Sequence, residues 1–158
     1  IEDPEEVSLY QVEEWVAGFE SWDVCDQVCM NLFEKVPSAV GRIPAWAARE
    51  EEFVRRTAFS LIACLAWHDK KATDESFIAY FPLIKQAASD ERNFVKKAVN
   101  WALRNMGKRN PALNQSAIAL AEELQHSESR SARWIAADAL RELRSDAVQK
   151  KVHEKPIP

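Results

Sequence analysis

Four residues have the types and the spacing to form a chemical site: Trp22, Asp26, Arg56 and Trp101. If residues 22–36 form a helix, Trp22 and Asp26 lie one turn apart on a single face, at positions i and i+4. A large flat aromatic ring beside a carboxylate is unusual on a helix surface, because each has a more favourable environment elsewhere. Together with a guanidinium and a second indole, the pair suits a cationic or sugar-like group that lies next to a phosphate.

The elements that must position these residues are helices, since apolar residues recur at helical spacing almost everywhere along the chain. The expected helices cover residues 9–19, 22–36, 43–47, 53–67, 75–88, a segment capped by Ser89 or Asp90 that ends at Gly107, 111–125 and 128–143. No segment shows the alternation of a strand, so the fold class is predicted to be all-α. The charged tail, residues 146–158, is expected to be frayed.

The second helices of successive pairs resemble one another. Segments that begin at Val24, Val54, Val95 and Ala132 align with offsets of 30, 41 and 37 residues. An irregular helix-pair repeat of about 40 residues is typical of HEAT and armadillo solenoids. We therefore predict one domain over residues 1–145, a right-handed α-α superhelix (solenoid) of about four HEAT-like helix pairs.

In such a solenoid the second helices lie side by side on the concave surface, so matching positions become neighbours. In this alignment Asp26, Arg56, Lys97 and Trp134 are equivalent. Trp22 lies one turn before that level and Trp101 one turn after it. Residues that are far apart in the sequence are thus expected to converge on one groove.

Composition and charge narrow the classes of function. The chain has 158 residues, of which 47% are hydrophobic and 29% charged, as in ordinary globular domains. Residues 1–26 carry nine acidic and no basic side chains, whereas the rest carry 21 basic and 16 acidic ones. The basic part permits a nucleic-acid surface, and the acidic leader is expected on the convex side or at the end of the solenoid.

Other residue types indicate no cofactor, no metal and no membrane. No stretch reaches the roughly 20 apolar residues that span a bilayer. Cys25, Cys29 and Cys64 are expected to be buried thiols in a reducing cytoplasm. The three histidines lie beside no acidic or thiol cluster and are assigned no metal. Because the sequence begins at Ile1 without a methionine, we expect it to be a fragment, a processed product or an incompletely covered part of a longer protein.

Each residue of the predicted site also has a purely structural interpretation. Tryptophans in solenoids commonly fill the core, which is the role expected here for Trp15, Trp46 and Trp67. Asp26 alone could be a solvated acid, and Arg56 could pair with Glu52 at i−4 on the surface. The coincidence of four unusual residues from three repeats at nearly one level favours the functional interpretation.

The sequence resembles the AlkD family, the DNA alkylation repair glycosylases with HEAT-like repeats. The resemblance covers roughly residues 8–144 and is carried by Ser-Trp-Asp-Val-Cys-Asp at 21–26, Phe-Val-Arg-Arg-Thr-Ala-Phe at 53–59, Phe-Val-Lys-Lys-Ala-Val-Asn-Trp-Ala-Leu-Arg at 94–104 and Gly-Lys-Arg-Asn-Pro at 107–111. It implies that Trp22, Asp26 and Trp101 match the catalytic-cleft aromatics and carboxylate of the family, and that Arg56 matches its cleft arginine. It also implies that the full protein has further helices N-terminal to the first helix of this sequence.

The activity implied by the resemblance is excision of N3- or N7-alkylated purines from double-stranded DNA, by a monomer. Alkylation makes the base a cationic leaving group, so the barrier is the oxocarbenium-like sugar, which Asp26 would stabilise. Trp22 and Trp101 would lie against the lesion nucleotide and Arg56 would hold a flanking phosphate. The further candidates for backbone contacts are Lys96, Lys97, Arg104, Lys108, Arg109, Arg130 and Arg133. The alternative is a non-catalytic HEAT-repeat module that binds DNA structure or a protein partner.

Overall fold

The computed structural model describes residues 7–154, and every regular element within that range is a helix. In chain order these are α1 (Leu9–Ala17), α2 (Trp22–Asn31), the short 3-10 helix η2 (Phe33–Lys35), α3 (Pro37–Val40), α4 (Ile43–Ala47), α5 (Glu52–His68), α6 (Asp74–Ile78), α7 (Phe81–Ala87), α8 (Asn93–Gly107), α9 (Pro111–Leu124), α10 (Arg130–Leu143) and α11 (Asp146–His153). The prediction of an all-α fold is confirmed. None of the helices described over residues 7–154 combines the length and the apolar character that a membrane span requires.

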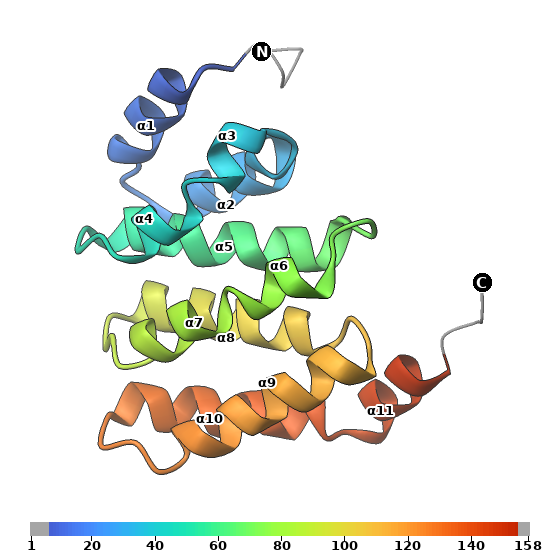
Figure 1. Cartoon of the computed structure of the whole chain (residues 1–158). Helices are drawn as coiled ribbons and strands as arrows, with labels where there is room; N and C mark the ends of the chain where they lie inside the picture. The colour runs from blue at the N-terminus through green and yellow to red at the C-terminus, as the bar shows by residue number, and fades with distance from the viewer. Residues whose placement is uncertain (1–6, 155–158) are drawn as a thin grey trace.

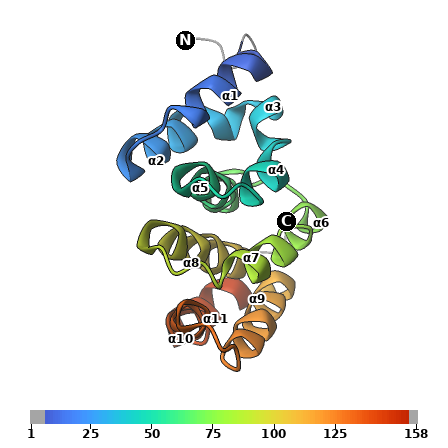
Figure 2. The same ribbon diagram turned by 90° about the vertical axis from the view of Figure 1, so that its left-hand side faces the viewer.

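The helices stack in two layers (Figures 1 and 2). One layer contains α2, α5, α8 and α10, in which each helix packs on the next. The other contains α4, α7 and α9, which pack against α5, α8 and α10 respectively. The predicted arrangement, with the second helices of successive pairs side by side, is therefore confirmed. We call the layer of α2, α5, α8 and α10 the inner layer.

The centre of the stack is α5, which is flanked by α2 and α8 in the inner layer. From Val54 to Ala66 all of its side chains except that of Arg55 are buried. The burial includes three polar residues, Arg56, Thr57 and Ser60. Polar groups are costly to bury unless they are hydrogen-bonded. These three residues therefore indicate a hydrogen-bonded polar cluster inside the stack.

Two helix boundaries differ from those predicted, and a proline explains the first of them. The helix expected over residues 75–88 is divided into α6 and α7, with Pro82 in the first turn of α7. Proline lacks an amide hydrogen and clashes with the preceding turn, but it is tolerated at a helix start. Pro37 likewise begins α3, but the helix expected to reach residue 36 already ends at Asn31, where the 3-10 helix η2 follows.

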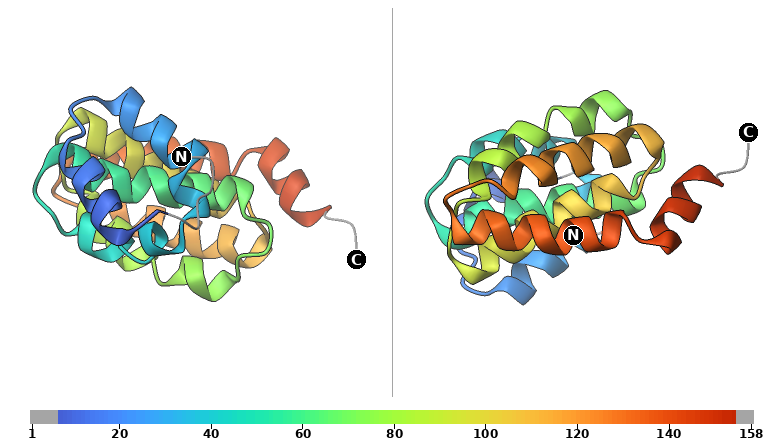
Figure 3. Two further views of the ribbon diagram at one scale, coloured as in Figure 1. Left: turned by 90° about the horizontal axis from the view of Figure 1, so that it is seen from above. Right: turned by 90° about the horizontal axis from the view of Figure 1, so that it is seen from below.

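The C-terminal tail is more ordered than predicted. Residues 146–153, expected to be frayed, form α11, whose N-cap Ser145 accepts a hydrogen bond from the Val148 amide. Val148 and Val152 of this helix are buried. Figure 3 shows α11 turning away from the axis of α10 at the end of the stack. Residues 155–158 lie outside the described range.

Gly107 is explained by close packing. The sequence suggested a C-terminal glycine, but Gly107 is the last residue of α8, and no residue in the described range has a positive φ. A Cβ at this position would lie 2.6 Å from Leu143 Cδ2 and 3.0 Å from Ala117 Cβ. The missing side chain therefore lets α8 approach α9 and α10.

Asp90 fastens the loop before α8 to α5. Its carboxylate accepts hydrogen bonds from Arg55 Nη1 (2.8 Å) and from Arg92 Nη2 (2.7 Å) and the Arg92 amide (3.0 Å). Burial acts to raise the pKa of Asp90, but the hydrogen bonds from Arg92 and Arg55 outweigh it and lower that pKa to about 2. Asp90, expected as a helix cap, thus orders the two residues before α8, whose N-cap is Arg92.

Candidate active site

The candidate site is centred on the carboxylate of Asp26, which faces α5 from the middle of α2. Arg56 donates to both carboxylate oxygens, from Nε to Oδ1 at 3.1 Å and from Nη2 to Oδ2 at 2.6 Å. The hydroxyl of Ser60 donates to Oδ1 at 2.8 Å. The side chain of Asp26 is 13% exposed and that of Arg56 is 7% exposed. The carboxylate is thus held in one orientation by charge-assisted hydrogen bonds and still reaches the surface.

Arg56 joins three helices of the inner layer. Besides its two bonds to Asp26 on α2, it donates from Nη1 to the Phe94 carbonyl of α8 at 2.5 Å. Its Cζ lies 5.8 Å from the ring centroid of Trp22, within the range of a cation–π contact. The role expected for Arg56 was to hold a DNA phosphate. The structure instead gives its guanidinium internal partners, with the carboxylate as the main one.

Trp22 lies at the open side of this ion pair. As the first residue of α2 it is 48% exposed, which is unusual for so large an apolar side chain. The structure therefore brings together three of the residues that the sequence analysis selected: Trp22, Asp26 and Arg56. Ser60 was not among them, although its position one turn after Arg56 on α5 places it on the same helix face.

Buried thiols pack beneath the site. Cys25, Cys29 and Cys64 are free and buried, as predicted. Cys25 Sγ lies 3.0 Å from Thr57 Oγ1, and the same hydroxyl donates to the Phe53 carbonyl at 2.6 Å. Burial raises the pKa of Cys64 far above its ordinary value, so that thiol stays protonated and unreactive. This apolar support fixes α2 against α5 and so fixes the level of Asp26.

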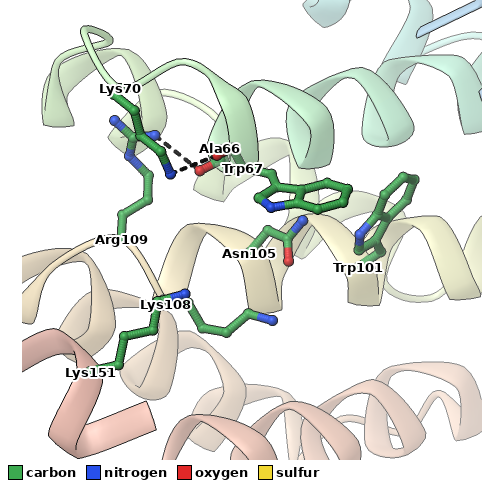
Figure 4. Close-up of a pocket in the computed structure, with 8 residues that line it drawn as sticks. All are labelled: Ala66, Trp67, Lys70, Trp101, Asn105, Lys108, Arg109 and Lys151. Atoms are coloured by element: carbon green, nitrogen blue, oxygen red, sulfur yellow. Dashed lines mark hydrogen bonds between the residues drawn. The ribbon is translucent and has the colours of Figure 1, made fainter. Parts of the chain in front are cut away.

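Trp101 lies farther along the inner layer than the other three residues. It follows Phe94, the α8 contact of Arg56, by seven residues, which corresponds to about 10 Å of helix. There it lines a hollow of about 550 Å³ together with Trp67 of α5, as Figure 4 shows. Trp67 was expected in the core, but it lies one residue before the end of α5 and is 53% exposed, with one side open to the hollow. Trp46, by contrast, is fully buried as predicted.

Arg109 is also committed to partners within the chain. Its two terminal nitrogens donate to the carbonyls of Ala66, Asp69 and Ala72 at 2.9–3.0 Å. Its Cζ lies 4.3 Å from the ring centroid of Phe77. These bonds satisfy carbonyls at and after the C-terminal end of α5. These bonds give Arg109 a structural role, and its predicted phosphate contact stays a prediction.

Two more of the predicted DNA contacts form ion pairs with α10. Arg104 donates to Glu142 Oε2 at 2.9 Å, and Lys108 Nζ lies 2.8 Å from Glu142 Oε1. Each side chain remains about one quarter exposed, at 28% for Arg104 and 24% for Lys108. Both can therefore face a ligand while they keep α8 and α10 aligned.

The remaining predicted contacts lie at the ends of α8 and α10. Lys97 and Arg130 are exposed. The Nζ atom of Lys96 lies 4.8 Å from the ring centroid of Trp134. Arg133 donates to the carbonyls of Ser127 and Glu128, both at 2.9 Å. A DNA contact by any of these residues stays a prediction.

No group of three or more His, Cys, Asp or Glu side chains suited to a metal ion occurs over residues 7–154. The chemistry that the described side chains offer is therefore that of one oriented carboxylate, exposed indoles and cationic groups. Lys151 also lines the hollow but was not a predicted site residue, because the segment that carries it was expected to be frayed.

Comparison with known proteins agrees with this architecture. A designed armadillo repeat protein, solved in complex with a (KR)4 peptide, is similar in fold, with a TM-score of 0.54 and 15% sequence identity over 92% of this chain and 69% of the other. No curated protein matches the sequence. The family model described as DNA alkylation repair enzyme matches residues 2–143. The helix-pair stack, the inner-layer carboxylate and this match over most of the sequence together identify the chain as a member of the DNA alkylation repair enzyme family.

Proposed function

We propose that this protein is a DNA glycosylase that removes N3- or N7-alkylated purines from double-stranded DNA, acting as a monomer. The observation that carries the proposal is the carboxylate of Asp26, held by Arg56 and Ser60 beside the exposed ring of Trp22. Membership of a DNA alkylation repair family supplies the class of substrate. The role of the carboxylate follows from the chemistry of the alkylated base.

An alkylated purine already carries a positive charge, so it can leave without protonation by a strong acid. When the N-glycosidic bond breaks, its electron pair returns to the base, and the sugar becomes an oxocarbenium-like cation. A carboxylate about 4 Å from that cation stabilises it by about 4 kcal/mol at an effective dielectric constant of 20. Water then adds to the anomeric carbon and gives its extra proton to bulk water, which leaves a hydroxyl group on the sugar. Asp26 would serve both steps, by its charge and by orienting the water.

Arg56 would control how much negative charge the Asp26 carboxylate presents to the sugar. In the free protein it neutralises much of the charge on Asp26 through two hydrogen bonds. A DNA phosphate that drew the guanidinium aside would increase the field that Asp26 exerts on the sugar, while Ser60 would still hold the carboxylate. Trp22 would pack against the deoxyribose, where an aromatic face also favours developing positive charge.

The test is release of 7-methylguanine or 3-methyladenine from methylated duplex DNA, detected by chromatography. Wild-type protein should release at least one of them. Asp26→Asn should lose most of this release. Asp23→Asn is its matched control, since it removes the same charge from an exposed position of the same helix and should leave release unchanged. Absence of release by folded wild-type protein would contradict the proposal and favour a non-catalytic DNA or protein binding module.

A further inference from the structure

A hollow between α5, α8 and α11 has the features of a ligand site, and it is separate from the site at Asp26. It measures about 550 Å³, within the range of small-molecule sites, and its lining includes no acidic side chain. Trp67 and Trp101 form one end, and Figure 4 shows their indoles close together with the amide of Asn105 beside them. Lys70 and Lys151 lie at the other end, and the Lys108 side chain runs between the two ends, as Figure 4 shows. Aromatic surface and positive charge are thus separated across one cavity.

The indoles offer an apolar surface that the fold covers only in part, since Trp101 is partly buried against the core and Trp67 is exposed. Trp67 is 53% exposed and stacks on His68 at a centroid distance of 4.5 Å. Asn105 donates from Nδ2 to the Ala63 carbonyl at 3.1 Å, which fixes its amide in place. The amide oxygen stays available as an acceptor at the side of the rings. A planar ring that carries N–H groups would find both stacking and a hydrogen-bond acceptor here.

The cationic end is only partly neutralised within the protein. Lys108 pairs with Glu142, and Lys70 Nζ donates to the Trp67 carbonyl at 2.7 Å. Lys151 is exposed on α11 and makes no ion pair or hydrogen bond within residues 7–154. The Lys70 and Lys151 charges therefore face the hollow without a carboxylate partner, which favours an anionic group.

We infer that this hollow binds a nucleotide with an unpaired base, with the base against Trp67 and Trp101 and the phosphate near Lys70, Lys108 and Lys151. The base must be unpaired, because a base stacked and paired in a duplex has no free face for an indole. DNA is the source of the nucleotide, since the hollow opens on the same inner layer as Asp26. The site goes beyond the proposed excision activity, which uses Trp22, Asp26, Arg56 and Ser60, and it requires no alkylated base.

The experiment compares two unmethylated fluorescent duplexes of the same sequence, one fully paired and one with a single bulged thymidine. Affinity for the whole chain is measured by fluorescence anisotropy. Wild-type protein should bind the bulged duplex about tenfold more tightly, as one base–indole stack allows. Trp67→Ala should reduce the ratio to about one, whereas Trp67→Phe should keep most of it. Trp67 is half exposed, so both variants should fold.

Matched controls separate the hollow from general effects of charge and surface. Lys151→Gln should weaken binding of the bulged duplex more than Lys150→Gln, its exposed neighbour on α11. Tyr10→Ala removes an aromatic ring that is 76% exposed on α1 and should leave the ratio unchanged. Equal affinity of wild-type protein for the two duplexes, or a tenfold ratio retained in Trp67→Ala, would overturn the inference. Micromolar binding of free dTMP with no preference for the bulge would overturn DNA as the source. Neither result depends on excision.

Discussion

Replacing Arg56 with methionine tests how the candidate site is held together. Methionine keeps much of the apolar stem of arginine but removes the guanidinium. The change removes two hydrogen bonds to Asp26 and one to the Phe94 carbonyl. Asp26 then keeps only the hydroxyl of Ser60 as a side-chain donor, while its side chain stays close to nine-tenths buried.

The expected loss of unfolding free energy is large, because the Asp26 carboxylate that remains is a buried charge without its partner. Removing one member of a buried ion pair typically lowers the free energy of unfolding by about 3–5 kcal/mol. Arg56→Lys keeps the charge but not the two-pronged geometry, so about 1–2 kcal/mol is expected. In the double variant Asp26→Asn, Arg56→Met, no unpaired charge remains. The two changes should therefore be non-additive, with the double variant more stable than Arg56→Met alone.

Urea unfolding at pH 7, followed by circular dichroism at 222 nm and linear extrapolation, measures these differences. The Asp26→Asn single variant completes the double-mutant cycle. A loss below about 1 kcal/mol in Arg56→Met, or strict additivity in the double variant, would refute the reasoning, because a buried and mutually dependent pair cannot behave so.

Three further predictions concern packing, acid stability and DNA binding. Gly107→Ala should lower the free energy of unfolding by about 1–3 kcal/mol through the clash with Leu143, whereas Gly41→Ala, whose Cβ would meet nothing closer than 3.5 Å, should be neutral in the same urea assay. Because the pKa of Asp90 is lowered to about 2, this group stabilises the fold above pH 4 and loses that effect as the pH falls towards 2. Asp90→Asn should thus cost about 1–2 kcal/mol at pH 7 and progressively less below pH 4, measured by urea unfolding across pH; a constant difference would contradict the linkage. If Lys97 contacts a phosphate, Lys97→Gln should reduce the slope of log K against log salt by about one in duplex binding, and an unchanged slope would exclude the contact.

The fold could be predicted from the sequence because its main signals are local. Apolar spacing and the recurrence at Val24, Val54, Val95 and Ala132 indicated the helix pairs and their stacking. Helix ends were predicted less well, since Pro82 could be taken as part of a continuous apolar pattern. The packing reason for Gly107 could not be seen, because it depends on Leu143 of a distant helix.

The level of the site residues could also be predicted from the sequence, whereas their contacts between helices could not. The alignment of repeats brought Asp26 and Arg56 to one level, and the structure places them in contact. The sequence could not show that the Arg56 guanidinium donates hydrogen bonds to Asp26 and to the Phe94 carbonyl, since each bond joins two helices. Trp67 was assigned to the core because helical spacing does not show whether neighbouring helices leave a hollow beside a side chain.

The central claim is that Asp26 acts on the sugar of an alkylated nucleotide, and single-turnover excision from methylated duplex DNA tests it most directly. The account predicts that Asp26→Asn lowers the rate constant for base release by about 100-fold or more while the affinity for the same duplex stays within about threefold. Base release by Asp26→Asn at the wild-type rate, with the variant folded and bound to DNA, would contradict it.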